Sequence, residues 1–222
     1  MSTSHRENIS CPSCGYEQDF EVWDSVNGSQ DPDLKEKLQK GELTRLVCEN
    51  CSSSVFVSFD LLYHDMEQKF MVLLRYPDEN GDVPDFDDKA NGLVRAMGDD
   101  YVLRSVYSFP DLLEKIRIFD DDLDDVTLEI LKYLFSITNQ FEPDDIILYE
   151  GIETSKEGDD QIVLIRPEGS EFVSYHYPLD KMDILEEPRK AVNLAELKQQ
   201  DIWISVDRFM IADYLTAAEE RR

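Results

Sequence analysis

The chain has 222 residues, of which 41% are hydrophobic and 32% charged, and its 22 basic and 49 acidic side chains give a formal net charge of −27. A domain of this length buries roughly 70% of the surface that its unfolded chain exposes, so its core requires neither metal nor disulfides. The acidity excludes a general binder of phosphate backbones, which needs clustered Lys and Arg, and disfavours an anionic membrane surface as the main partner.

The first part of the chain predicts strands around one clear helix. Residues 17–26 alternate partly between apolar and polar side chains, which indicates a strand. A helix is predicted over 32–40, because Asp31 can cap it, Pro32 suits its first position and Gly41 can end it in the left-handed conformation. Further strands are predicted over 43–47, 55–59 and 69–76.

The second part changes from helices to strands. An acidic, turn-rich stretch over 77–92 is the predicted linker. The later elements, in chain order, are a strand over 101–107, helices over 110–119 and 126–135, strands over 146–149, 161–166 and 171–177, and a terminal helix over 207–219.

These elements predict an α+β fold in three parts. Residues 1–76 form a zinc-ribbon-like β module with a helical insertion, residues 77–140 hold the acidic linker and two central helices, and residues 141–222 form a small antiparallel sheet with a terminal helix. The pattern leaves open whether these parts form one body or two.

Four cysteines carry the strongest chemical signal. They occur as Cys11-Pro-Ser-Cys14 and Cys48-Glu-Asn-Cys51, separated by 33 residues that include the predicted helix. Each short turn can present two thiolates to one ion, and four thiolates complete the tetrahedral shell of a structural Zn²⁺. We therefore predict Zn²⁺ bound by all four cysteines, with no open position for a catalytic water.

Three other interpretations of the cysteines stay open. Soft sulfur ligands also suit an iron–sulfur centre. A dithiol redox pair is a weaker interpretation, because such a pair normally opens a helix in a βαβ unit and neither pair here does so. The four could also be ordinary reduced cysteines.

The order of several motifs resembles the CpXC domain family of bacteria and archaea, which is named for two Cys-Pro-x-Cys motifs. The resemblance covers roughly residues 7–135 and rests on the two cysteine pairs, Asp31-Pro32 with its helix, Gly41-Glu42-Leu43, residues 62–67 (Leu-Tyr-His-Asp-Met-Glu) and residues 114–119 (Glu-Lys-Ile-Arg-Ile-Phe). Glu49 replaces the proline of the second motif. Because that proline is not a metal ligand, the replacement does not affect the expected metal binding. The resemblance implies a metal-binding domain and supplies no activity.

The expected location is the cytoplasm. The N-terminal residues lack the apolar stretch of a secretory signal, and the longest apolar run, 70–74, is too short to cross a bilayer. Paired Cys-x-x-Cys motifs in such a chain indicate metal or redox chemistry rather than disulfides.

Few other residues suggest a site. His64 beside Asp65 could be an oriented base, although such a histidine more often makes one local hydrogen bond. His176 is expected to pack within a strand, and His5 is expected to lie in a mobile tail. The five aspartates of 120–125 could hold a hard cation, but a solvated turn that precedes a helix explains them as well.

The favoured function is a zinc-stabilised acidic protein-interaction module with a basic protein partner, since a large negative field steers basic surfaces toward it. One alternative is an enzyme that uses His64, Asp65 and acidic residues. Another is a nucleic-acid-associated zinc ribbon, for which Arg6, Lys35, Lys37, Lys40 and Arg45 are the available basic residues. No P-loop, dinucleotide fingerprint, nucleophile elbow or His-Glu-x-x-His motif occurs, so no catalytic or cofactor-binding residue is assigned.

Overall fold

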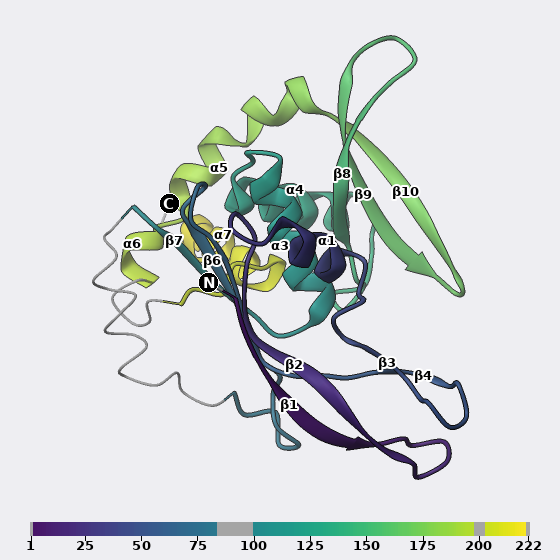
Figure 1. Ribbon diagram of the computed structural model, residues 1–222. Coiled ribbons are helices and arrows are strands. Elements are labelled where there is room, and N and C mark those ends of the chain that lie inside the picture. The colour runs from purple at the N-terminus through teal and green to yellow at the C-terminus, as the bar shows by residue number, and fades with distance from the viewer. Residues whose placement is uncertain (1, 84–99, 198–202, 221–222) are drawn as a thin grey trace. The chain divides into compact units, whose positions relative to one another are not determined.

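The computed structural model describes residues 2–83, 100–197 and 203–220 of this α+β chain (Figure 1). Its contacts group the chain into two compact units, Met1–Phe109 and Pro110–Arg222, and each unit is considered by itself. No helix in the described ranges combines the length and apolarity that a membrane span requires.

The first unit is built on a mixed five-stranded sheet. The strands are β1 (Thr3–Ser10), β2 (Glu17–Asn27), β5 (Leu61–Asp65), β6 (Phe70–Leu74) and β7 (Val102–Val106), in the spatial order β1-β2-β5-β6-β7. A helix, α1 (Pro32–Gln39), and a two-stranded hairpin of β3 (Arg45–Val47) and β4 (Ser54–Phe56) lie between β2 and β5 in the sequence. The predicted helical insertion between the cysteine pairs is therefore confirmed.

Strand β6 carries the core of this sheet. All five of its residues are buried, which explains why its sequence is continuously apolar rather than alternating. It pairs antiparallel with β5 on one side and parallel with β7 on the other. The sheet thus takes its last strand from beyond residue 76.

Helix α1 begins and ends where its sequence indicates, with one difference. Pro32 occupies the first turn, and Gly41 has φ +68° just beyond the helix. Asp31 stands at the N-cap position, but its carboxylate accepts hydrogen bonds from the backbone amide and hydroxyl of Ser2 instead of capping the helix. Asp31 therefore fixes the start of the chain beside α1.

The second unit places helices against a three-stranded antiparallel sheet. Its first helices are α3 (Phe109–Asp120) and α4 (Asp125–Thr138), and its sheet has the order β10-β9-β8, from β8 (Leu148–Thr154), β9 (Asp160–Glu168) and β10 (Glu171–Pro178). The chain continues through a 3₁₀ helix, η1 (Leu179–Leu185), and through α5 (Glu186–Ala191), α6 (Leu194–Leu197) and α7 (Arg208–Glu220). The predicted C-terminal antiparallel sheet is confirmed.

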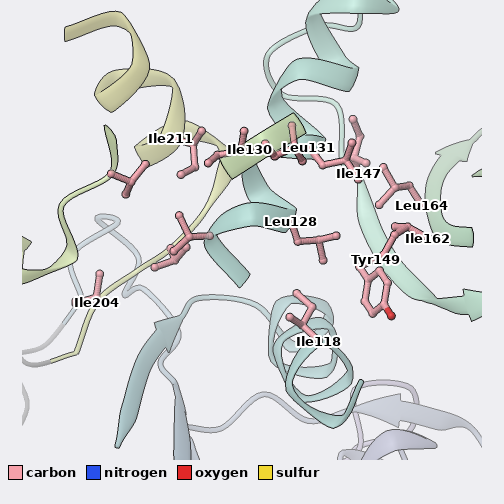
Figure 2. Close-up of a cluster of buried hydrophobic side chains, with 14 residues drawn as sticks. Ile118, Leu128, Ile130, Leu131, Ile147, Tyr149, Ile162, Leu164, Ile204 and Ile211 are labelled. Atoms are coloured by element: carbon pink, nitrogen blue, oxygen red, sulfur yellow. The ribbon is translucent and has the colours of Figure 1, made fainter. Parts of the chain in front are cut away.

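An apolar core joins the helices of this unit to its sheet (Figure 2). Ile118 of α3 and Leu128 of α4 are fully buried, as are Ile162 of β9 and Ile211 of α7. Because residues from four elements share one core, the second unit has an apolar basis for stability that is independent of the cysteines.

A buried group of charged side chains accompanies that core. Glu114 and Lys115 of α3 and Asp125, Glu129 and Lys132 of α4 are all at most 5% exposed. The Nζ of Lys132 lies 2.9 Å from Glu114 and 3.0 Å from Glu129, and the Nζ of Lys115 lies 3.1 Å from Glu129. These ion pairs fix the helices α3 and α4 against each other, a feature that helical periodicity alone does not predict.

The predicted domain boundaries at 76/77 and 140/141 stay a prediction, while the described contacts divide the chain between Phe109 and Pro110. Residues 84–92 of the predicted linker lie outside the described residues. The strand β1 corrects one expectation: His5 lies in this strand opposite Val22, not in a mobile tail.

Candidate metal centre

Two β-hairpins carry the cysteine pairs. Cys11 and Cys14 lie in the turn between β1 and β2, and Cys48 and Cys51 lie in the turn between β3 and β4. Figure 1 shows the two hairpins side by side with their tips at the same end of the unit. The fold thereby brings together two pairs that are far apart in the sequence.

The first cysteine turn is closed by two backbone hydrogen bonds. The amide of Gly15 donates to the carbonyl of Cys11 at 2.8 Å, and the amide of Cys11 donates to the carbonyl of Tyr16 at 2.8 Å. Gly15 has φ +70°, a left-handed conformation that glycine adopts without strain. We refer to residues 11–15 as the first knuckle.

The second turn repeats this geometry with a different sequence. The amide of Ser52 donates to the carbonyl of Cys48 at 2.8 Å, and the amide of Cys48 donates to the carbonyl of Ser53 at 2.9 Å. Ser52 takes φ +59°, so a non-glycine residue occupies the left-handed position. Glu49 stands where the first knuckle has Pro12, which shows that the turn forms without proline. We refer to residues 48–52 as the second knuckle.

The four sulfur atoms form one cluster. All lie within 4.8 Å of one another, with 3.7 Å between Cys11 and Cys51 and 3.6 Å between Cys14 and Cys48. A regular tetrahedron of sulfurs around a Zn²⁺, with Zn–S bonds of about 2.3 Å, has edges of about 3.8 Å. The cluster therefore has the size of a four-cysteine metal site. Among the described residues, these four cysteines are the group whose potential ligand atoms lie close enough to share one ion.

Ser53 gives the cluster a neighbouring hydroxyl. Its Oγ lies 3.3 Å from the Sγ of Cys11 and 3.0 Å from the Sγ of Cys51. Hydrogen bonding to Ser53 is the main reason that the pKa of Cys11 is lowered to about 6, and it also lowers the pKa of Cys51. Ser53 thus favours the thiolate form that a metal requires.

The pKa of Cys48 shifts in the opposite direction. The backbone amide of Cys51 lowers its pKa, but burial and hydrogen bonds with Cys51 and Cys11 prevail and raise it to about 11. Cys48 and Cys11 are buried, whereas Cys14 and Cys51 are exposed. A bound cation would take the place of the remaining protons, because metal binding releases protons from its thiol ligands.

Gln18 joins the two hairpins. Its side-chain amide donates to the carbonyl of Val47 at 3.1 Å, and its side-chain oxygen accepts from the amide of Glu49 at 2.9 Å. The Nδ2 of Asn50 lies 3.6 Å from the Sγ of Cys14. Sequence reasoning missed Gln18, Asn50 and Ser53, because no local pattern shows which polar side chain reaches across to another hairpin.

His64 and Asp65 form hydrogen bonds with separate partners. The Nε2 of His64 lies 3.3 Å from the hydroxyl of Tyr101, and burial lowers the pKa of the imidazole. The Oδ1 of Asp65 accepts the backbone amides of Glu67 and Gln68 at 3.0 and 3.1 Å, so this carboxylate shapes a turn. The hydrogen bond that the structure gives His64 reaches Tyr101, 37 positions away in the sequence, so the expected local bond is wrong.

Three of the aspartates of 120–125 are engaged in separate interactions. Asp121 accepts the hydroxyl of Tyr149, and Asp125 lies 3.3 Å from the Nζ of Lys115 inside the second unit. Asp124 caps α4, where its carboxylate accepts the amide of Thr127. The structure therefore supports the interpretation of these acids as a turn that opens a helix.

The remaining histidines also have structural settings. His5 bridges two carboxylates on the surface, with Nε2 3.1 Å from Glu7 and Nδ1 3.0 Å from Asp24. His176 lies in β10 as predicted, but its side chain is exposed, so the expectation that it packs is wrong. Alternation along the strand turns its neighbours Tyr175 and Tyr177 inward and leaves His176 outside.

An acidic groove lies beside the first knuckle. Four carboxylates line it, from Glu17, Asp19, Glu21 and Glu49, together with the exposed aromatic ring of Tyr16. Arg6 is the basic residue among its lining side chains. The groove therefore concentrates negative charge next to an aromatic surface.

A model of the CpXC protein family matches residues 9–132, which is more than half of the chain. The match contains both knuckles and continues through β7 and α3 into α4. No curated protein and no solved structure matches the chain.

Proposed function

We propose that this chain, which belongs to the CpXC protein family, is a zinc-stabilised module that binds a basic protein surface. The observation that supports the metal most directly is the convergence of four sulfurs from two matching knuckles. Their short separations of 3.6 and 3.7 Å agree with the edges of a tetrahedral Zn²⁺ site.

The role we propose for zinc is structural. Four cysteine ligands fill its tetrahedral shell, so no position remains for a substrate or a catalytic water. Strands β3 and β4 have three residues each, and such a short hairpin is marginal by itself in water. Structural zinc supplies about 10–16 kcal/mol of apparent binding free energy to small modules, which is enough to hold both hairpins.

The partner we propose is recognised by charge. The formal net charge of −27 attracts basic surfaces over long distances and repels nucleic acid. The acidic groove beside the first knuckle offers four carboxylates to Lys or Arg side chains, and Tyr16 can stack on a guanidinium or ammonium group. The zinc-bound hairpins would thus position the recognition surface.

Elemental mass spectrometry on untagged protein tests the metal. We expect one zinc per chain, and we expect Cys14→Ser and Cys51→Ser to lose the zinc together with the order of residues 11–16 and 46–55. Iron in its place would assign a different centre, and the absence of any metal together with reactive thiols would refute the zinc module.

Affinity capture with a matched pair of variants tests the partner. The first variant neutralises the groove with Glu17→Gln, Asp19→Asn, Glu21→Gln and Glu49→Gln. The control neutralises the same residue types on the exposed surface of the second unit with Glu153→Gln, Asp183→Asn, Glu157→Gln and Glu171→Gln.

We expect the native chain and the control to retain a basic partner at low salt and to release it at high salt. The groove variant should fail to retain that partner. Equal retention by both variants, or retention that is indifferent to salt, would contradict recognition through the groove.

A further inference from the structure

We infer that the four-cysteine cluster is also an oxidative modification site, at which peroxide joins the two knuckles through disulfides and expels the metal. This inference rests on the proposed zinc site and adds a chemical reaction to it. It rests on two observations: which cysteines are exposed, and which pairs of sulfur atoms lie closest together.

Exposure divides the cysteines into two kinds. Cys14 and Cys51 are exposed, whereas Cys11 and Cys48 are buried. Each knuckle therefore has one cysteine that is exposed to solvent and one that is buried.

Each exposed sulfur adjoins a buried sulfur of the other knuckle. Cys51 lies 3.7 Å from Cys11, and Cys14 lies 3.6 Å from Cys48. A disulfide requires the two sulfurs to approach to about 2.05 Å, roughly 1.6 Å closer than in these two pairs. The geometry assigns Cys14 and Cys51 as the attacked residues and Cys48 and Cys11 as their resolving partners.

The reaction balances with hydrogen peroxide as the oxidant. An exposed thiolate attacks one peroxide oxygen, the O–O bond breaks, and the products are a sulfenic acid and hydroxide. The buried thiolate then attacks the sulfenic sulfur, forms the S–S bond and expels a second hydroxide. Each disulfide thus consumes one peroxide and two electrons from two thiolates, and Zn²⁺ leaves because its ligands are lost.

The charge of the chain selects the class of oxidant. Glu49 belongs to the second knuckle and Glu17 follows the first knuckle closely in the sequence, and both line the acidic groove. Such a field disfavours the approach of anionic disulfides, whereas a neutral peroxide is not repelled.

The experiment uses the full chain with its zinc content measured before any oxidant is added. Peroxide is then added without reductant, and released zinc is followed with a chromogenic chelator. Trypsin should cut after Arg6, Lys35, Arg45 and Lys69, which places the first cysteine pair and the second pair on separate peptides. Non-reducing mass spectrometry with electron-transfer fragmentation identifies which cysteines are joined.

We expect zinc release to rise together with a linked species that contains both cysteine peptides, with Cys11–Cys51 and Cys14–Cys48 as its bonds. Dithiothreitol followed by zinc should restore the starting protein. Zinc that stays bound, cysteines that stop at sulfinic acid, or disulfides confined to single peptides would overturn the inference. A chain without zinc before oxidation would instead contradict the proposed function, so the two failures are distinguishable.

Discussion

The hydroxyl of Tyr63 lies so close to Gly28 that a Cβ atom at residue 28 would come within 2.0 Å of its oxygen. Tyr63 is fully buried in β5, and the amide of Gly28 donates to the carbonyl of His64 at 2.8 Å, so the two segments cannot separate without losing that hydrogen bond. The approach of β2 to β5 therefore depends on the absence of a side chain at residue 28.

Gly28→Ala should destabilise the first unit by about 1–3 kcal/mol, the usual cost of overpacking a filled core. Chemical denaturation followed through Trp23 of β2, in a Trp203→Phe background that removes the other tryptophan, measures the loss. Tyr63→Leu should also destabilise, but the double variant should lose less than the sum of the two single losses, because the clash is then removed. Strict additivity would show that the two residues do not oppose each other in this way.

Removal of zinc should unfold the hairpins selectively. We expect a strong chelator to raise hydrogen exchange over residues 11–16 and 46–55, since the short strands β3 and β4 lack a large core of their own. Helix α4 serves as the internal control, and its protection should stay unchanged because its core is formed within the second unit. Uniform loss of protection in both units, or no change in the hairpins, would contradict a local role for the metal.

Gln18 should affect metal affinity although it ligates nothing. Gln18→Ala removes two hydrogen bonds that tie β2 to the second hairpin, and we expect zinc affinity to fall roughly 10-fold, at the lower end of the effect of outer-shell partners. Competition with a chelator of known affinity measures the change. Gln30→Ala is the matched control, since the Gln30 side chain contacts Met66 away from the knuckles, and it should leave the affinity unaltered.

The buried ion pairs of the second unit should be sensitive to the loss of one partner. Lys132→Met leaves Glu114 and Glu129 with one ammonium fewer, and breaking a buried pair typically costs about 3–5 kcal/mol. The exposed pair of Lys190 with Glu187 provides the comparison, and Lys190→Met should cost at most about 1 kcal/mol. Equal effects in denaturant titrations would argue against the burial of the network.

The buried Lys132 and Lys115 should make the stability of the second unit sensitive to alkali. Burial lowers the pKa of Lys132, but Glu114 and Glu129 prevail and raise it above the ordinary value of 10.5, and Glu129 and Asp125 do the same for Lys115. A raised folded-state pKa contributes stability that is complete below pH 10.5 and is lost as the pH rises through the folded pKa.

Burial and the hydrogen bond to Asp121 also raise the pKa of Tyr149, which acts in the same direction. For the lysines and Tyr149, urea titrations should therefore show stability that begins to decline above about pH 10, the region of the ordinary Lys and Tyr pKa values. Lys132→Met should reduce the slope of that decline. If Lys132→Met leaves the slope of the decline unchanged, groups other than Lys132 cause the loss of stability at high pH.

Local signals explain what could be predicted from the sequence. The knuckles, α1 and β6 each carry their pattern within a few residues: paired cysteines with a turn residue, Pro and Gly at the helix ends, and a continuous apolar run. The convergence of the four cysteines could be predicted from their spacing alone, because two turns of one kind can present four sulfurs to one point.

Elements without such a pattern were missed for physical reasons. Nearly all side chains of β1 are exposed, so no apolar alternation marks it as a strand. The 3₁₀ helix η1 and the short helices α5 and α6 have seven, six and four residues, too few for a helical period to stand out in the sequence. Glu114 and Lys132 resemble surface residues, because only a partner on the facing helix makes the burial of their charges tolerable.

The chain order of the knuckles has a consequence for biosynthesis. Both knuckles, with β1 to β4, precede β7 and the whole second unit in the sequence. Because a nascent chain emerges from its N-terminal side, the metal ligands reach the ribosome exit before the helices α3 and α4 have been translated. The proposed zinc ligands are therefore available for loading during translation, and the β1–β2 hairpin can serve as an early template onto which β5, β6 and finally β7 add.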